Sequence, residues 1–185
     1  MRFTLAFLSC IVSVTMRLNA EIDVGRPAGG TPYDAHLGPV RQTYSRFSGG
    51  APSVSDVRAQ MRTAYRFRYY FDPAQPYTPQ LPSVTESRQQ GDCKAKSLWV
   101  AYKMDDRKVR FVVGRIKSVT NMSHAWLIWK GPTGWMVLDP TFYSRPLDMA
   151  RLGPGEFTML YSYTAGGKFV HGAPKKAESK YGDHG

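Results

Sequence analysis

The sequence predicts an α+β fold, because helical patterns come first along the chain and strand patterns follow them. The helical patterns lie between residues 55 and 104, whereas β-branched and aromatic runs fill residues 109–171. With 185 residues, of which 42% are hydrophobic and 13% are aromatic, the chain can bury one core. This composition excludes a chain that is disordered throughout and favours one domain without internal repeats.

The first twenty residues have the layout of a cleavable secretory signal. Arg2 precedes a mostly apolar run over residues 3–16, and the small Ala20 precedes the polar residues 21–23. The run is too short for a transmembrane helix, which needs about 20 apolar residues. We therefore expect residues 1–20 to be removed as a signal peptide, no transmembrane segment, and a secreted or periplasmic protein.

The segment between the signal peptide and the first helical pattern is rich in Gly, Pro and Ser. Residues 21–54 show neither a helical nor a strand period, which predicts an extended arm, and a pro-segment over a cleft is one interpretation of it. The domain is expected to span residues 55–172, with a first helix that starts at Ser55 or Asp56. Residues 173–185 are polar and Lys-rich, which predicts a flexible basic tail.

A second helix is expected from residue 92 to about residue 104. Ala95, Leu98, Trp99 and Tyr102 recur there at i, i+3, i+4 and i+7. Between the two helices, prolines at positions 73, 76, 79 and 82 disfavour regular structure. Strands are expected at the runs that follow, Val109–Lys117, His124–Lys130, Trp135–Thr141 and Phe157–His171, the last broken near residues 165–167.

Charge is strongly unbalanced, with 25 Lys and Arg against 14 Asp and Glu, or a net charge of +11. Such a chain is attracted to anionic polymers, membranes or envelope glycans, although charge alone identifies no partner. Arg58, Arg62 and Arg66 form a row beside aromatic residues, as a nucleic-acid surface would. A solvated helix face over an aromatic core is the favoured interpretation, so no specific nucleic acid is expected.

Cys93 is the only cysteine besides Cys10 of the expected signal peptide, so the processed chain has no partner for an internal disulfide. Most lone cysteines are small buried residues without chemistry. The run Gly91-Asp92-Cys93, however, puts this thiol at a helix start, where unpaired N–H groups and the helix dipole favour a thiolate. The same N–H groups can donate to an oxyanion, so the position favours a nucleophile.

His124 and Asp139 are candidates for the base and for the group that orients it. Residues 131–134, Gly-Pro-Thr-Gly, have the composition of a four-residue hairpin loop. This loop pairs Ile128 with Val137 and puts His124 diagonal to Asp139, about 7–8 Å apart along the backbone. The same register predicts the pairs Lys130–Trp135, Trp126–Asp139 and His124–Thr141.

The hairpin register also assigns side chains to two faces of the sheet. Ala125, Leu127 and Trp129 share a wholly apolar face, which is predicted to be the core side. Trp126 shares the other face with His124 and is therefore our candidate for substrate contact. Its alternative role is that of an ordinary core residue.

Gln90 lies shortly before the cysteine and is our candidate for a second oxyanion donor, because a neutral amide can donate to a developing negative charge. A polar loop residue without function is the alternative. His36, His171 and His184 show no metal-ligand spacing, so neither a metal site nor a cofactor is expected.

Four runs of the chain together resemble the transglutaminase-like cysteine peptidase superfamily, in its bacterial exported type: GDCKAKSLWVAYKM, RFVVGRIK, SHAWLIWK and GWMVLDPT. The resemblance spans residues 91–141. It implies a papain-like core in which a cysteine on a helix N-terminus packs against an antiparallel sheet that carries His and Asp. Cys93 would be the nucleophile, His124 the general base and acid, and Asp139 the residue that orients His124.

The chain departs from the pattern of this superfamily at one position near the cysteine. Many exported relatives have an acidic residue two positions after the cysteine, where this chain has Ala95. The chain also lacks a calcium-loop pattern and the extra β-domains of animal transglutaminases. The sequence therefore resembles a compact bacterial hydrolase and leaves a calcium role without its expected carboxylate.

The sequence thus predicts an exported thiol-dependent hydrolase, or a transamidase, of amide bonds in a peptide or protein substrate, acting in or near the cell envelope. One alternative is a non-catalytic envelope-binding module with the same fold, for which Trp126 and Arg58 would matter more than Cys93. A secreted nucleic-acid binder, whose affinity would fall steeply with salt, is a third interpretation without motif support. The sequence leaves the oligomeric state open.

Overall fold

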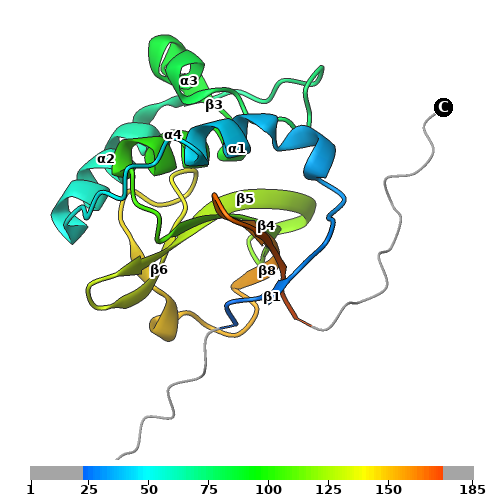
Figure 1. Cartoon of the computed structure of the whole chain (residues 1–185). Coiled ribbons are helices and arrows are strands. Elements are labelled where there is room, and N and C mark those ends of the chain that lie inside the picture. Colours follow the sequence, from blue (N-terminus) through cyan, green and yellow to red (C-terminus); the bar gives the residue numbers. More distant parts are fainter. Residues whose placement is uncertain (1–22, 173–185) are drawn as a thin grey trace, which may run out of the picture.

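The computed structural model describes residues 23–172, apart from the side chains of residues 119–122. The expected signal peptide over residues 1–20 and the expected tail over residues 173–185 lie outside the described residues. Within them, four α-helices gather on one face of a large antiparallel sheet (Figure 1), which confirms the predicted α+β class. No helix among the described residues has the length and apolar character to cross a membrane.

The helices precede most of the strands along the chain. The α-helices are α1 (Gly38–Tyr44), α2 (Val54–Arg66), α3 (Pro82–Arg88) and α4 (Cys93–Met104), and the short 3₁₀ helices are η1 (Asp34–His36) and η2 (Met149–Arg151). The longer strands are β4 (Val109–Ile116), β5 (Val119–Gly131), β6 (Gly134–Leu138) and β8 (Phe157–Tyr163). The shorter strands are β1 (Arg26–Pro27), β2 (Arg68–Tyr69), β3 (Gln90–Gly91), β7 (Leu147–Asp148) and β9 (Lys168–Val170).

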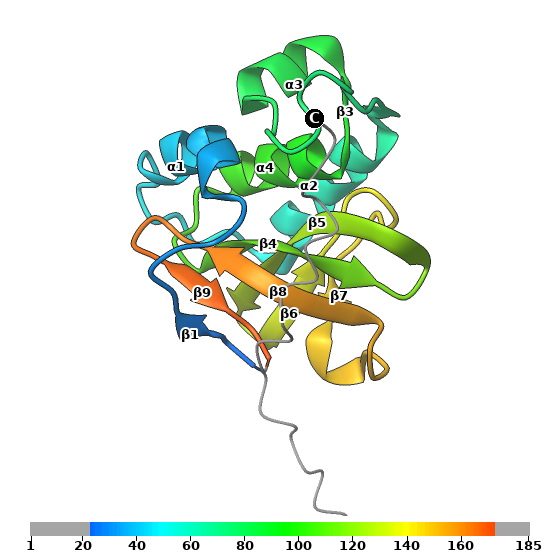
Figure 2. The same ribbon diagram turned by 90° about the vertical axis from the view of Figure 1, so that its right-hand side faces the viewer.

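Seven strands form the main sheet in the order β1-β9-β8-β4-β5-β6-β7, and each neighbouring pair is antiparallel. Figure 2 shows this sheet beneath the helices, with β1 and β9 at one edge. β2 and β3 form a separate parallel pair beside α4. The strands expected from the β-branched runs therefore form within a few residues of their predicted bounds.

Helix α4 is surrounded by other elements, which explains its apolar sequence. It contacts α2, α3 and α1 as well as β5 and β4 of the sheet. Leu98, Val100 and Ala101 are completely buried. Asp92 caps the helix by accepting a hydrogen bond from the backbone N–H of Ala95 at 3.0 Å. The predicted helix over residues 92–104 is confirmed.

Helix α2 is amphipathic, as its sequence predicts. Arg58, Arg62 and Arg66 are exposed, whereas Val57 and Met61 are buried, so the arginine row is a solvated helix face. The helix starts slightly earlier than the expected Ser55 or Asp56, because the side chain at position 53 accepts from the N–H of Asp56 and completes a capping box.

The expectation of an extended arm over residues 21–54 is wrong for its second half. Helix α1 forms there, and Val40, Tyr44 and Phe47 are buried in the main core. The Gly and Pro content of this segment predicted irregular structure, yet a proline is tolerated in the first turn of a helix, which is where α1 has one. Helix α3 was missed for the same reason, since Pro82 is its first residue.

The hairpin between β5 and β6 has the predicted register up to Leu138, but its loop is shorter than the expected four residues, because Gly131 pairs with Gly134 and only residues 132–133 form the turn. The pairs Lys130–Trp135 and Ile128–Val137 form as expected. The expected pairs Trp126–Asp139 and His124–Thr141 do not form, because β6 ends at Leu138. At Asp139 the chain turns, and its carbonyl accepts from the N–H groups of residues 142 and 143 at 3.3 and 2.9 Å.

Both faces of the sheet are buried, whereas the sequence predicted one core face. Ala125, Leu127 and Trp129 pack in the main core, so the predicted core face is confirmed. Trp126 and Ile128 on the opposite face form a second apolar cluster, against which parts of β7, η2 and β8 pack. The β6–β8 connection therefore covers the face that was expected to be open.

Candidate active site

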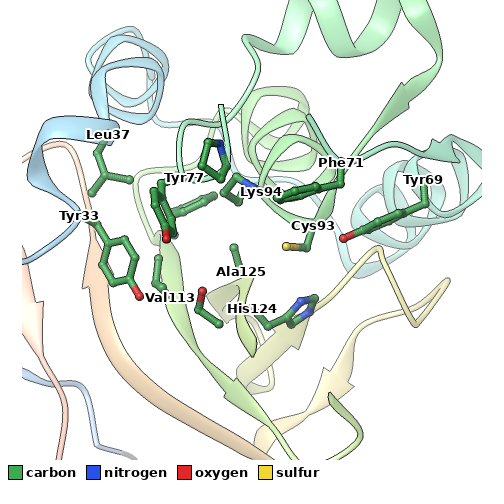
Figure 3. Close-up of a pocket in the computed structure, with 13 residues that line it drawn as sticks. Tyr33, Leu37, Tyr69, Phe71, Tyr77, Cys93, Lys94, Val113, His124 and Ala125 are labelled. Atoms are coloured by element: carbon green, nitrogen blue, oxygen red, sulfur yellow. The ribbon is translucent and has the colours of Figure 1, made fainter. Parts of the chain in front are cut away.

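Cys93 is the first residue of α4, at the point where the helix meets β5 (Figure 3). Its relative exposure is only 9%, and among the described residues it is a free cysteine. The preceding Asp92 holds the helix start through its cap on Ala95 and pairs with the ammonium group of Lys94. The thiol therefore sits at a fixed helix N-terminus beside a carboxylate that already has two partners.

His124 and Asp139 are brought into direct contact. The His124 Nε2 atom and the Asp139 Oδ2 atom are 2.9 Å apart, and the two side chains are 5% and 0% exposed. The other carboxylate oxygen, Oδ1, accepts from the backbone N–H of Thr141 at 3.0 Å. The backbone turn at Asp139 thus orients its carboxylate, and the carboxylate orients the imidazole ring of His124.

The environment of His124 favours its charged form. Burial opposes the charge, but the hydrogen bond with Asp139, the negative charge of Asp139 and the neighbouring Cys93 raise the pKa of His124 to about 9. Because Nε2 is engaged by Asp139, Nδ1 is the ring nitrogen that remains for the thiol. The three residues therefore lie in the order Cys93, His124, Asp139.

Two aromatic rings pack against the imidazole of His124. The ring of Trp126 stacks on His124 with 5.9 Å between centroids and 22° between planes, and the ring of Phe142 lies 5.3 Å away. Trp126 is completely buried and also packs edge-on against Phe157. This burial argues against the substrate contact that the sequence suggested for Trp126. The contact between the Trp126 ring and the imidazole instead indicates that Trp126 helps to orient His124.

Gln90 lies on β3, three residues before the thiol. Its Oε1 atom accepts from the guanidinium of Arg68 at 2.5 Å, and it is not among the residues that line the cavity beside Cys93. Because the carbonyl end of the side chain is engaged, the side-chain NH₂ group is the end left to act as a donor.

Two residues near the thiol were not singled out in the sequence. Lys96 is buried, with its Nζ atom 3.4 Å from the carbonyl oxygen of Tyr65; burial lowers the pKa of Lys96, while the negative charge of Asp139 opposes that change. A lysine three residues after the cysteine, on a helix most of whose residues are buried, was the available signal. Tyr69 is the second: it is about half-exposed, and its partial burial, together with the nearby Cys93 and Asp92, raises the pKa of Tyr69 to about 12.

A cavity of about 180 Å³ lies against Cys93 and His124, as Figure 3 shows. It runs along β4 and β5 beneath the 69–77 segment and reaches the N-terminal segment that carries Tyr33 and Leu37. The N-terminal segment therefore forms a wall of this cavity. A chemical group beside the thiol has space to enter the fold.

The described residues do not offer a metal site. Within residues 23–172 no group of three or more His, Cys, Asp or Glu side chains is arranged to hold an ion. Next to the cysteine, Asp92 is occupied by Lys94, and position 95 is an alanine.

Comparison with solved structures shows what the fold resembles, whereas no protein-family model and no curated protein sequence matches the chain. Calcium-bound LapG of Legionella pneumophila aligns with a TM-score of 0.56 at 15% sequence identity, covering 77% of this chain and 83% of LapG. EGTA-treated LapG aligns with a TM-score of 0.54 at 16% identity, covering 75% and 81%. LapG is a transglutaminase-like cysteine protease. The resemblance to the transglutaminase-like superfamily is thus confirmed at the level of the fold, and this chain has the fold of LapG.

Proposed function

We propose that the chain is an exported thiol protease that cleaves amide bonds in peptides or proteins, with Cys93, His124 and Asp139 as its catalytic residues. The observation that carries the proposal is the buried 2.9 Å contact between His124 and Asp139, placed behind a cysteine at a helix start. A base oriented by a carboxylate next to a nucleophile is the arrangement that thiol acyl transfer needs. The LapG-like fold supports a protein substrate.

The proposal assigns a group to each step of the reaction. The Cys93 thiolate attacks the amide carbonyl carbon, a C–S bond forms, and the π electrons move to the oxygen. As the C–N bond breaks, the His124 imidazolium gives its proton to the leaving nitrogen, which departs as an amine. Water then gives a proton to His124 and attacks the thioester. The C–S bond breaks, the carboxylic acid leaves, and the Cys93 thiolate and the His124 imidazolium are restored. If an amine replaces water in that step, the product is a new amide, so the products decide between hydrolysis and transamidation.

Backbone and side-chain donors next to Cys93 suit the oxyanion. The first N–H groups of a helix have no intrahelical partner, and that of Cys93 adjoins the attacked carbonyl. Gln90 is the proposed second donor, through its side-chain NH₂ group. The favourable helix dipole at this end of α4 adds to the stabilisation of both the thiolate and the oxyanion.

Calcium is not expected to control this enzyme, although LapG has been solved with calcium bound. The described residues hold no suitable ligand cluster, and the cation beside Cys93 is the Lys94 ammonium group. We expect the rate of substrate cleavage to change by less than about twofold when EGTA replaces added calcium. An EGTA-induced loss of activity that calcium restores would contradict this expectation.

The pH dependence of Cys93 alkylation by iodoacetamide tests the proposed function directly. At pH 6.5 an ordinary thiol is almost entirely protonated and reacts slowly. Because the pKa of His124 is about 9, the imidazolium stays charged at this pH and stabilises a thiolate. We expect rapid labelling in the wild type at pH 6.5 and a loss of about 10- to 100-fold in His124→Ala.

A histidine outside the site provides the matched control for this experiment. His36→Ala removes a partly buried imidazole of η1 that is not in contact with Cys93, and it should label like the wild type. Slow labelling in the wild type, unchanged by His124→Ala, would contradict the proposed function and direct attention to the non-catalytic envelope-binding alternative.

A further inference from the structure

The cavity beside Cys93 is lined mainly by apolar and aromatic side chains, with Lys94, Ser123 and His124 as polar members of the lining. Its deeper lining comes from two segments of the sheet and from the N-terminal segment: Phe111, Val113, Ala125, Tyr33 and Leu37. Tyr77, Pro76 and Phe71 line it from the 69–77 segment. In another protein, an apolar cavity of about 150 Å³ holds benzene, so a volume of about 180 Å³ has room for an aromatic ring.

The mouth of this cavity lies where a substrate must bind. In the acyl-enzyme, the Cα atom of the acyl residue is only two bonds from the Cys93 Sγ atom. The side chain of that same residue therefore begins at the end of the cavity that Cys93 and His124 form. Tyr69 and Phe71, which are 53% and 44% exposed, flank this end and offer apolar surface to an approaching peptide.

Charge at the cavity excludes a basic side chain. None of the described residues that line it is acidic, whereas Lys94 and His124 contribute positive charge. The Lys94 ammonium group lies 5.4 Å from the centre of the Phe71 ring and is paired with Asp92. A Lys or Arg side chain in the cavity would lose its hydration without gaining a counter-ion.

We propose that this cavity binds the side chain of the residue whose carbonyl Cys93 attacks, and that this residue is aromatic or large and aliphatic. The substrates are then peptides or proteins cleaved after residues such as Phe or Leu. This inference rests on the proposed function, because it needs Cys93 as the nucleophile. It goes further by naming the substrate class from the shape and lining of the cavity.

Peptide chloromethyl ketones test the preference without a known substrate. The probes are acetyl-Ala-Ala-Phe, acetyl-Ala-Ala-Ala and acetyl-Ala-Ala-Lys chloromethyl ketone, and intact mass reports the second-order rate of Cys93 modification. Each rate is divided by the rate of the same probe with N-acetylcysteine. We expect the Phe probe to react at least about tenfold faster than the Ala probe, and the Lys probe no faster than the Ala probe.

A variant that fills the cavity shows where the preference arises. Val113→Phe adds a ring to the cavity wall, and the ratio of the Phe to the Ala rate should fall to about one. Val24→Phe is the matched control: it makes the same change at an exposed residue outside the lining, so the ratio should stay at the wild-type value. Should Val113→Phe fail to fold, Leu37→Phe fills the same space from the opposite wall.

The outcomes separate this inference from the proposed function. Equal rates for the Phe and Ala probes, in a protein whose iodoacetamide labelling depends on His124, would overturn the inference and leave the protease proposal intact. The inference is equally overturned if Val113→Phe and Leu37→Phe both fold and keep the wild-type preference. Iodoacetamide labelling that does not depend on His124 would remove the proposed function itself, and the inference with it.

Discussion

Cys93→Ala is expected to lower peptide cleavage by at least about 10⁴-fold while the protein remains folded. The thiolate is the group that forms the covalent intermediate, and no second cysteine lies among the described residues to replace it. The substitution removes one sulfur atom from a residue that is 9% exposed, so the free energy of unfolding should fall by only about 1 kcal/mol. Initial rates on a fluorogenic peptide library, together with urea unfolding, measure both effects.

Cys93→Ser is the matched variant for this experiment. It keeps nearly the same volume and a hydroxyl group at the helix start, but a serine in a site built for a thiolate is a far weaker nucleophile. We expect it to be as inactive as Cys93→Ala. If either variant keeps substantial turnover, Cys93 is not the nucleophile, and a binding role for the same cavity becomes the better account of the site.

The part of the site that could be predicted from the sequence depends on local rules. The position of Cys93 follows from the Asp92 cap and the helical period of the next twelve residues. The nearness of His124 to Asp139 follows from a hairpin whose register is the predicted one, because a two-residue turn flanked by the Gly131–Gly134 pair keeps the same pairing as the expected four-residue loop. These features need only short-range spacing, which is why a single sequence indicates them.

The geometry of the contact between His124 and Asp139 nevertheless differs from the predicted one. The hairpin pairing was expected to continue to Thr141, but β6 ends at Leu138. Pro140 has no N–H to donate to a ladder, and the chain turns at Asp139. The carboxylate meets the imidazole from a turn, where it is also held by the N–H of Thr141. The hairpin register thus predicted that His124 and Asp139 are neighbours, but it did not predict the geometry of their contact.

The cavity could not be predicted because its walls come from distant parts of the chain. Tyr33 and Leu37 belong to the segment that looked like an arm, and they meet Phe111 and Ala125 only in the folded molecule. The burial of Trp126 has a similar origin, since the β6–β8 connection covers the face of the sheet on which it lies. Periodicity assigns Trp126 to a face, but it does not say what covers that face.

Asp139→Asn is expected to lower kcat/KM by about 10³- to 10⁴-fold. Asparagine matches the volume of aspartate, and its carbonyl can still accept from the N–H of Thr141. The NH₂ group then faces His124 Nε2 and favours the ring form whose proton is on Nδ1, which cannot accept the thiol proton. The lost carboxylate also removes a hydrogen bond and a negative charge that raise the pKa of His124.

The pH profile distinguishes this orienting role from a loss of fold. In the wild type, kcat/KM should decline as the pH rises through about 9, because His124 then loses the proton that the leaving amine needs. In Asp139→Asn the pKa of His124 is lower, so the remaining activity should decline at lower pH. Asp148→Asn is the matched control, because the Asp148 carboxylate, like that of Asp139, accepts from the backbone N–H two residues later, but among the described residues Asp148 is exposed and contacts neither His124 nor Cys93. It should keep both the wild-type kcat/KM and the wild-type pH profile.

An Asp139→Asn protein that is folded and as active as the wild type would show that His124 needs no carboxylate, and the proposed chemistry would then rest on Cys93 and His124 alone.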